Sequence, residues 1–120
     1  NVDGIKYVCG HLDFLHQKFN QELHIVFGMV NDKDISSVLQ ELPKDATYYF
    51  TKASVKRALP ENELLALAEE AGLKGTTYPT VVEAVQAAKK NCPPKDLIFV
   101  GGSSFIVADL LANRDTLNLY

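Results

Sequence analysis

The sequence predicts an α/β fold, a three-layer αβα sandwich around a mainly parallel β-sheet. Segments with the three-and-four spacing of a helix alternate along the chain with short apolar runs rich in β-branched and aromatic residues. Gly, Pro, Asn and Asp mark the breaks between them. Strands that alternate with helices pair in parallel through right-handed crossovers, which places helices on both faces of the sheet. We therefore expect one helix followed by four strand–helix units.

The first unit is an amphipathic helix over residues 2–20, with Asn1 or Asp3 placed to cap it. Its apolar side chains recur on one helical face, at Ile5, Val8, Leu12, Leu15 and Phe19. Residues 23–30 follow as a nearly continuous apolar run, which is typical of a strand covered on both faces. This run predicts the first strand.

A polar loop at residues 31–34 leads to the second helix. Asp34 is placed to cap this helix and Pro43 ends it. Its apolar residues are Ile35, Val38, Leu39 and Leu42. Residues 46–51 have the β-branched and aromatic content of a second strand.

The third helix follows a connection through Ser54, Arg57 and Pro60, and Gly72 ends it. Its apolar face consists of Leu64, Leu67, Ala68 and Ala71. Residues 76–78 form at most a short third strand.

Thr80 and Glu83 have the spacing of a capping box, which opens a fourth helix that runs to about Lys90. After a break at residues 91–94, residues 96–100 are the fourth strand, 101–104 a turn and 105–112 the last helix. The tail to Tyr120 alternates weakly and is a candidate edge strand.

The strand at residue 23 should be central, with those at 46 and 76 on one side and that at 96 on the other. In such sheets, ligands bind beyond the carboxyl ends of the strands, where the strand order reverses. This rule selects the loops at residues 31–34, 51–57, 76–78 and 101–105. It also brings the first and last of these loops together.

The composition excludes several classes of function. The chain of 120 residues is 47% hydrophobic and 22% charged, which suits a single domain with its own core. A net charge of −3 and the lack of a Lys/Arg stripe argue against nucleic acid as a partner. No apolar run approaches the ~20 residues of a membrane span. Cys9 and Cys92 fit no zinc or redox spacing, so we expect two reduced thiols in a cytoplasmic protein.

Two loops are candidates for binding an anion. Glycines and a helix N-terminus at residues 101–104 bring backbone N–H groups toward a ligand, although the same residues also suit a tight turn with Ser103 or Ser104 as an N-cap. Lys33 can pair with a carboxylate held there, or can be a solvated surface lysine. Arg57 has the same two interpretations.

Other sites are excluded. Asp32 and Asp34 resemble the acidic pair of phosphoacceptor receivers, but residues 76–78 lack the required third Asp. His11, His16 and His24 form no metal-binding set, and Cys9, Asp13 and His16 are spread too widely along one helix face. We predict no metal ligand and no catalytic residue in this chain.

Three segments together resemble the C-terminal domain of folylpolyglutamate synthases and dihydrofolate synthases, in the Mur ligase superfamily. They are GMVNDKDISSVL at 28–39, YYFTKASVKRALPENEL at 48–64 and DLIFVGGSSFIVADLL at 96–111. The resemblance covers nearly the whole chain and implies a Rossmann-like sandwich. It also implies an ATP-dependent ligase in which ATP phosphorylates a folate or dihydropteroate carboxylate. The amine of L-glutamate then attacks the acyl phosphate to give an amide.

The resemblance further implies roles for individual residues. Lys33, Ser103, Ser104 and Asn1 match positions that hold the incoming glutamate. Arg57 and Phe105 are candidates for the edge of the same cleft.

The remaining implications concern the parent enzyme. Residues 1–120 would be one domain of a larger, monomeric two-domain enzyme, because the Asp and His that accompany Asn1 in the family motif would precede it. ATP and Mg²⁺ would belong to the N-terminal ATPase domain of the same polypeptide, so we expect neither to bind this chain tightly and expect the isolated chain to be inactive. The alternative is a stand-alone, non-catalytic Rossmann-like domain that binds a small anionic ligand.

Overall fold

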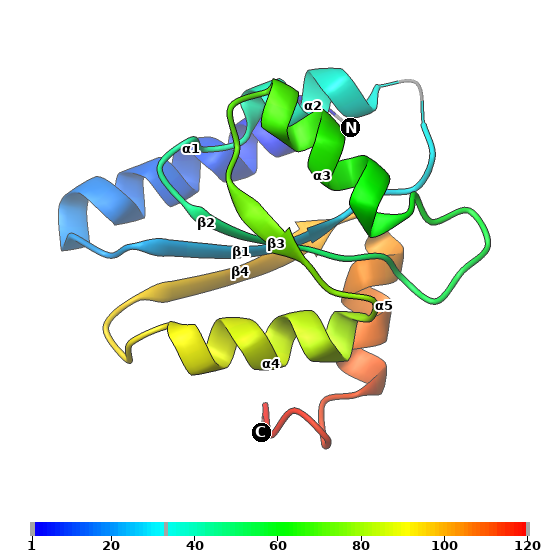
Figure 1. Ribbon diagram of the computed structural model, residues 1–120. Coiled ribbons are helices and arrows are strands. Elements are labelled where there is room, and N and C mark those ends of the chain that lie inside the picture. The colour runs from blue at the N-terminus through cyan, green and yellow to red at the C-terminus, as the bar shows by residue number, and fades with distance from the viewer. Residues whose placement is uncertain (1, 33, 120) are drawn as a thin grey trace.

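The structure, a computed structural model, describes residues 2–32 and 34–119, with only the backbone described for residues 2–7. Helices and strands alternate as predicted: α1 (Val2–Phe19), β1 (Leu23–Gly28), α2 (Ile35–Glu41), β2 (Thr47–Phe50), α3 (Glu61–Glu70), β3 (Gly75–Thr77), α4 (Val81–Asn91), β4 (Leu97–Gly102) and α5 (Ser104–Ala112). Figure 1 shows α1, α2 and α3 over one face of the sheet and α4 and α5 over the other. The predicted α/β sandwich is confirmed.

The four strands are parallel and lie in the order β3-β2-β1-β4, as the sequence predicted. The chain steps outward from β1 to β2 and β3, and then returns to the other side of β1 with β4. The strand order therefore reverses between β1 and β4. In the register of this pair, Leu23 lies opposite Leu97 and Gly28 opposite Gly102.

All six residues of β1 are buried, which explains why its sequence is apolar without alternation. Leu23, Ile25 and Phe27 point into the core beneath α1, α2 and α3, and Val26 points into the core beneath α4 and α5. His24, on the latter face, is buried and its Nδ1 lies 2.9 Å from the Tyr49 hydroxyl.

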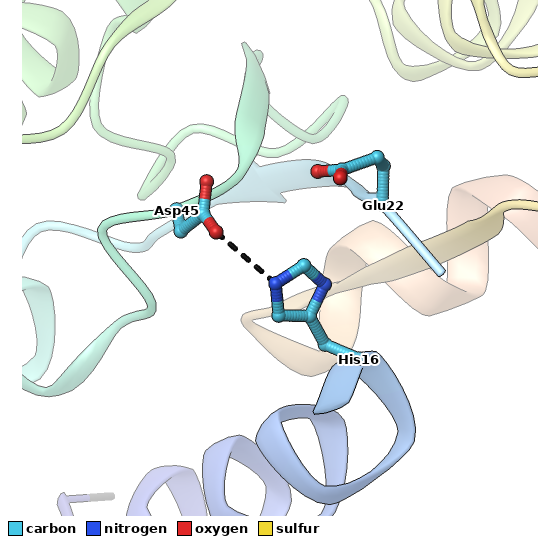
Figure 2. A group of neighbouring side chains, drawn as sticks. All are labelled: His16, Glu22 and Asp45. Atoms are coloured by element: carbon cyan, nitrogen blue, oxygen red, sulfur yellow. Dashed lines mark hydrogen bonds and ion pairs between the residues drawn. The ribbon is translucent and has the colours of Figure 1, made fainter. Parts of the chain in front are cut away.

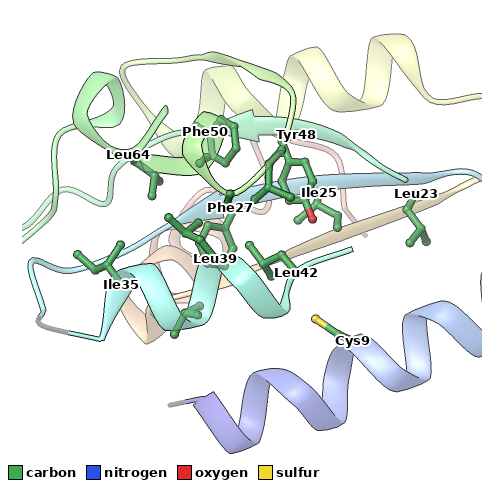
Figure 3. Packing of buried hydrophobic residues seen from close by; sticks show 14 of the residues in the cluster. Cys9, Leu23, Ile25, Phe27, Ile35, Leu39, Leu42, Tyr48, Phe50 and Leu64 are labelled. Atoms are coloured by element: carbon green, nitrogen blue, oxygen red, sulfur yellow. The ribbon is translucent and has the colours of Figure 1, made fainter. Parts of the chain in front are cut away.

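The larger core joins β1 and β2 to three helices, and Figure 3 shows its side chains interdigitating between the sheet and α2. Leu39 and Leu64 are fully buried in it, and burial of each such side chain stabilises the fold by about 1.5–3 kcal/mol. Cys9 of α1 lies at its margin, and burial raises the pKa of its thiol to about 11. Cys9 and Cys92 are both free thiols, as expected.

The local sequence predicts the capping of the helices only in part. Thr80 caps α4 as predicted, because its hydroxyl oxygen accepts a 3.1 Å hydrogen bond from the Glu83 N–H. Asp34 and Ser103 occupy the N-cap positions of α2 and α5, but neither side chain makes a capping hydrogen bond. Asp34 has φ −92° and ψ 7°, which is not the extended conformation of a capping residue.

Apart from shifts of one residue at several ends, two predicted boundaries and one predicted element were wrong. β1 ends at Gly28, and Val30 instead forms an isolated antiparallel bridge with Ala58. Gly101 and Gly102 belong to β4 rather than to the turn after it. The tail is not an edge strand: after α5 the chain turns repeatedly and buries Leu117 in the core beneath α4 and α5.

None of the helices in the described parts of the chain combines the length and the apolar character needed to span a membrane.

Candidate functional site

The carboxyl ends of β1 and β4 meet where the strand order reverses. Gly28 and Gly102 are paired residues at these ends, and the Ser103 N–H donates a 2.9 Å hydrogen bond to the Gly28 carbonyl. Gly102 has φ +109°, and a Cβ there would lie 2.0 Å from the Gly28 oxygen. Only glycine fits this position, so the approach of the two strand ends requires Gly102.

Gly28 brings α5 close to β1. A Cβ at Gly28 would lie 2.5 Å from Cδ1 of Ile106 and 2.6 Å from the Thr51 carbonyl oxygen. Ile106 is fully buried at the start of α5. The first turn of α5 therefore lies directly over the end of the central strand.

A cleft of about 810 Å³ opens at this edge of the sheet. That volume lies within the range of small-molecule sites, about 300–1,000 Å³. Three groups of residues line it. The loop after β1 and α2 contribute Met29, Val30, Asp32, Asp34 and Val38. The segment of β4 and α5 contributes Phe99, Val100, Gly101, Gly102, Ser103, Ser104, Phe105 and Val107, and Val8 and Arg57 come from other elements.

Four of the six predicted site residues share this cleft. Ser103, Ser104, Arg57 and Phe105 all line it. Lys33 and Asn1 lie outside the described residues, so their positions in the site stay predictions. The two residues that flank Lys33 in sequence, Asp32 and Asp34, line the cleft.

Backbone hydrogen bonds fix the Arg57 loop against the loop after β1. The Asn31 N–H donates to the Arg57 carbonyl at 2.8 Å, and the Leu59 N–H donates to the Met29 carbonyl at 2.8 Å. These bonds place the backbone of Arg57 at the cleft edge, where its guanidinium can form a bidentate pair with a carboxylate.

A second contact, which sequence analysis missed, ties the same loop to α5. Asp109 accepts two hydrogen bonds from Ser54, one from its N–H at 2.8 Å and one from its hydroxyl at 2.9 Å. Ser54 and Asp109 are far apart in sequence and form no motif. No local signal identifies this pair.

The cleft carries charges of both signs. Arg57 is cationic, and the first N–H groups of α5 at the cleft wall have no carbonyl partner within the helix and favour an anion. Asp32 and Asp34 are anionic, and Asp32 Oδ1 accepts a 2.9 Å hydrogen bond from the Asp34 N–H. The described part of the cleft can therefore receive carboxylates on one side and an amine on the other.

The fold and this cleft define a class of protein, an α/β domain with a cleft of small-molecule size where the order of a parallel sheet reverses. Comparison with known proteins identifies the family, because residues 1–104 match the Mur ligase, glutamate ligase domain. The chain belongs to this family. The predicted resemblance to the C-terminal domain of folylpolyglutamate and dihydrofolate synthases is confirmed.

Two curated relatives are similar in sequence. A dihydrofolate synthase/folylpolyglutamate synthase of Buchnera aphidicola is 30% identical over 123 residues, which cover 100% of this chain and 28% of the relative. A probable bifunctional folylpolyglutamate synthase/dihydropteroate synthase of Haloferax volcanii is 32% identical over 105 residues, or 84% of this chain and 12% of the relative. The chain thus spans less than a third of either protein.

Solved structures share the fold. Escherichia coli FolC in complex with DHPP and ADP superimposes with a TM-score of 0.85 at 25% identity, over 98% of this chain and 27% of FolC. A bifunctional folylpolyglutamate synthase/dihydrofolate synthase from Yersinia pestis, complexed with AMPPNP and Mn ion, has a TM-score of 0.79 at 22% identity, over 96% of this chain and 27% of that one.

Proposed function

We propose that this chain is the glutamate-binding domain of a larger two-domain enzyme, an ATP-dependent amide ligase that adds L-glutamate to folate or dihydropteroate. In this reaction the folate carboxylate is first activated as an acyl phosphate. The amine nitrogen of glutamate then attacks the acyl carbon, an amide bond forms and phosphate leaves.

The mixed charge of the cleft is the observation that carries this proposal. A simple anion would meet Arg57 and the start of α5, but would also meet the carboxylates of Asp32 and Asp34. Glutamate has two carboxylates and one amine, so each side of the cleft has a matching group in one ligand. This match favours an amino acid over the alternative of a small anion.

Each residue has a distinct role in this proposal. The hydroxyls of Ser103 and Ser104 and the first N–H groups of α5 bind a glutamate carboxylate, and Arg57 binds the second carboxylate at the cleft edge. Lys33, in the loop between Asp32 and Asp34, adds a cation beside the glutamate, and Asn1 contributes an amide as in the family motif. None of these groups takes part in bond making, so their contribution is to position the amine for attack.

The cleft also has a feature expected of a site that lies between two domains. Phe105 and Val107 line it and are 37% and 38% exposed, respectively. Apolar surface beside a polar site is suited to cover by a second domain. We assign that cover to an N-terminal ATPase domain of the same polypeptide, which would also hold the folate substrate.

The nucleotide belongs to that other domain in our proposal. This sequence contains neither a GxxxxGK[ST] phosphate loop nor a GxGxxG loop. ATP with Mg²⁺ supplies the phosphoryl group that activates the carboxylate, and the residues of this chain orient glutamate and exclude water from the closed cleft. A protein of this kind would work in the cytoplasm as a monomer.

Incorporation of labelled glutamate by the full-length parent protein tests the proposal. With ATP and Mg²⁺, we expect label to appear in the glutamylated product of dihydropteroate, of a folate or of both. Glutarate, which has both carboxylates but no amine, should bind more weakly than glutamate. The alternative of an anion-binding domain would be favoured if neither acceptor were labelled and glutarate bound as tightly as glutamate.

A further inference from the structure

Three side chains with metal-binding atoms gather at the opposite end of the sheet from the cleft. His16 lies in the last turn of α1, Glu22 directly precedes β1 and Asp45 precedes β2 (Figure 2). Because β1 and β2 are parallel, both carboxylates lie at the amino ends of the strands. One ligand atom from each residue lies within 4.8 Å of the others.

The His16 ring is held in the orientation that a metal ligand needs. Its Nδ1 is hydrogen-bonded to the carbonyl oxygen of Gln21, so this nitrogen carries a proton and donates it. In the neutral ring, Nε2 then presents a lone pair, and it lies 3.1 Å from Oδ2 of Asp45. Histidines that bind metals donate one ring N–H to a carbonyl or carboxylate in the same way.

A lone pair and a carboxylate at 3.1 Å repel each other unless a positive charge lies between them. A proton on Nε2 supplies that charge, and so does a metal ion. The Glu22 carboxylate adds a further negative charge to the same group. A proton on Nε2 makes this contact a His16–Asp45 ion pair, and a metal ion at the same place would displace that proton.

The backbone around the group is fixed by contacts that do not use the candidate ligand atoms. The Glu22 N–H donates to Oδ1 of Asp96 at 3.1 Å, and the Gln21 side-chain amide donates to the Lys95 carbonyl at 2.9 Å. These bonds attach the turn before β1 to the turn before β4. The Glu22 and Asp45 side chains remain exposed and accessible to an ion.

We propose that His16, Glu22 and Asp45 bind a divalent transition-metal ion, with Zn²⁺ as the best match and water as the fourth ligand. One imidazole and two carboxylates suit Zn²⁺, whereas Mg²⁺ and Ca²⁺ prefer oxygen ligands alone. Ligands at about 2.0–2.2 Å from tetrahedral Zn²⁺ lie about 3.4 Å apart, close to the His16–Asp45 distance. The exposed carboxylates close the rest of the gap by rotation.

Such an ion would join the end of α1 to the starts of β1 and β2. Its role is structural, because the site lies at the far end of the sheet from the cleft and shares no residue with it. The inference is therefore independent of the proposed ligase function.

Calorimetric titration of the 120-residue chain with ZnCl₂ tests the site, in a Cys92→Ser background that removes the partly exposed thiol. We expect one saturable site, a higher melting temperature with Zn²⁺ and no comparable binding of MgCl₂. His16→Gln and Asp45→Asn should each weaken Zn²⁺ binding about tenfold or more, because loss of even an outer-shell partner of a metal ligand costs about 10- to 100-fold in affinity. His11→Gln is the matched control, because His11 is an exposed histidine of the same helix, and it should leave the affinity unchanged.

The proposal is overturned if ZnCl₂ shows no saturable binding, or if His16→Gln binds as tightly as the unchanged chain. Equal weakening by His11→Gln would also overturn it, since binding would then reflect histidine content alone. Circular dichroism checks that each variant is folded. Glu22→Gln changes only an exposed side chain, so it provides a second test of the site if His16→Gln fails to fold.

Discussion

Replacement of Gly102 by alanine should destabilise the domain strongly. Gly102 has φ +109°, and an added Cβ would lie 2.0 Å from the Gly28 carbonyl oxygen, a backbone atom that cannot rotate away. Forcing a non-glycine residue into such a conformation costs about 1–3 kcal/mol. Overpacking against a fixed neighbour costs about 1–3 kcal/mol more. The expected loss is therefore about 2–6 kcal/mol, a large part of the roughly 5–15 kcal/mol that stabilises a typical domain.

Gly10→Ala is a control that should change the free energy of unfolding in the opposite direction. Gly10 lies within α1, and a Cβ there would meet nothing within 4 Å. Alanine is the better helix former, so this change should stabilise the chain by about 0.5–1 kcal/mol.

Urea unfolding followed by circular dichroism measures both changes. Gly102→Ala should lower the midpoint by about 1 M or more, and Gly10→Ala should raise it slightly, with similar slopes. If Gly102→Ala unfolded within about 1 kcal/mol of the unchanged chain, the close approach of the two strand ends would not be what requires glycine.

Three further predictions concern function and thiol chemistry. In the full-length parent, Lys33→Ala should lower kcat/KM for glutamate about 10- to 150-fold, the loss of one charge-assisted contact. Lys90→Ala, which changes an exposed lysine of α4, should not. Equal kinetics would make Lys33 a solvated surface residue. The purified 120-residue chain should fold but show no glutamate ligation with ATP, and turnover by it would mean that the catalytic groups lie within this domain. At pH 8, iodoacetamide should modify Cys92 about tenfold or more faster than Cys9. Burial raises the pKa of both thiols, that of Cys9 to about 11, and Cys9 is also the less accessible of the two. Peptide mapping by mass spectrometry would show the order, and similar rates would contradict it.

The fold was predictable because its signals are local. Residues 23–28 form an apolar run broken only by His24, and such a run is typical of a strand covered on both sides. The capping pair of Thr80 and Glu83 is equally local, and its hydrogen bond forms as predicted. Alternation of these elements then limited the topology to a few parallel arrangements.

The predictions were wrong where one local sequence pattern is compatible with more than one structure. Weak alternation in the tail suggested a strand, but an irregular segment buries Leu117 equally well. Asp34 has the residue type of an N-cap, yet its N–H is bonded to Asp32 and its backbone is not extended. Residue type alone does not determine these backbone conformations.

The candidate site was predictable as a region more than as a set of contacts. The rule that ligands bind at the reversal point selected Arg57, Ser103 and Ser104, because it needs only the strand order. The Ser54–Asp109 contact could not be predicted, since nothing near either residue specifies the other. The same holds for His16 and Asp45, which meet only after α1 and β2 have packed.

The pairing of β1 with β4 has a consequence for how the chain is made. Within this domain β1 is synthesised well before β4, so β1 keeps one open side until most of the domain has been synthesised. An apolar strand with unpaired backbone groups is a template for pairing with other chains. A chain truncated after α4 lacks β4, so β1 keeps its open edge and the chain should aggregate. It should also fail to bind a ligand in the cleft, because β4 forms part of the cleft wall.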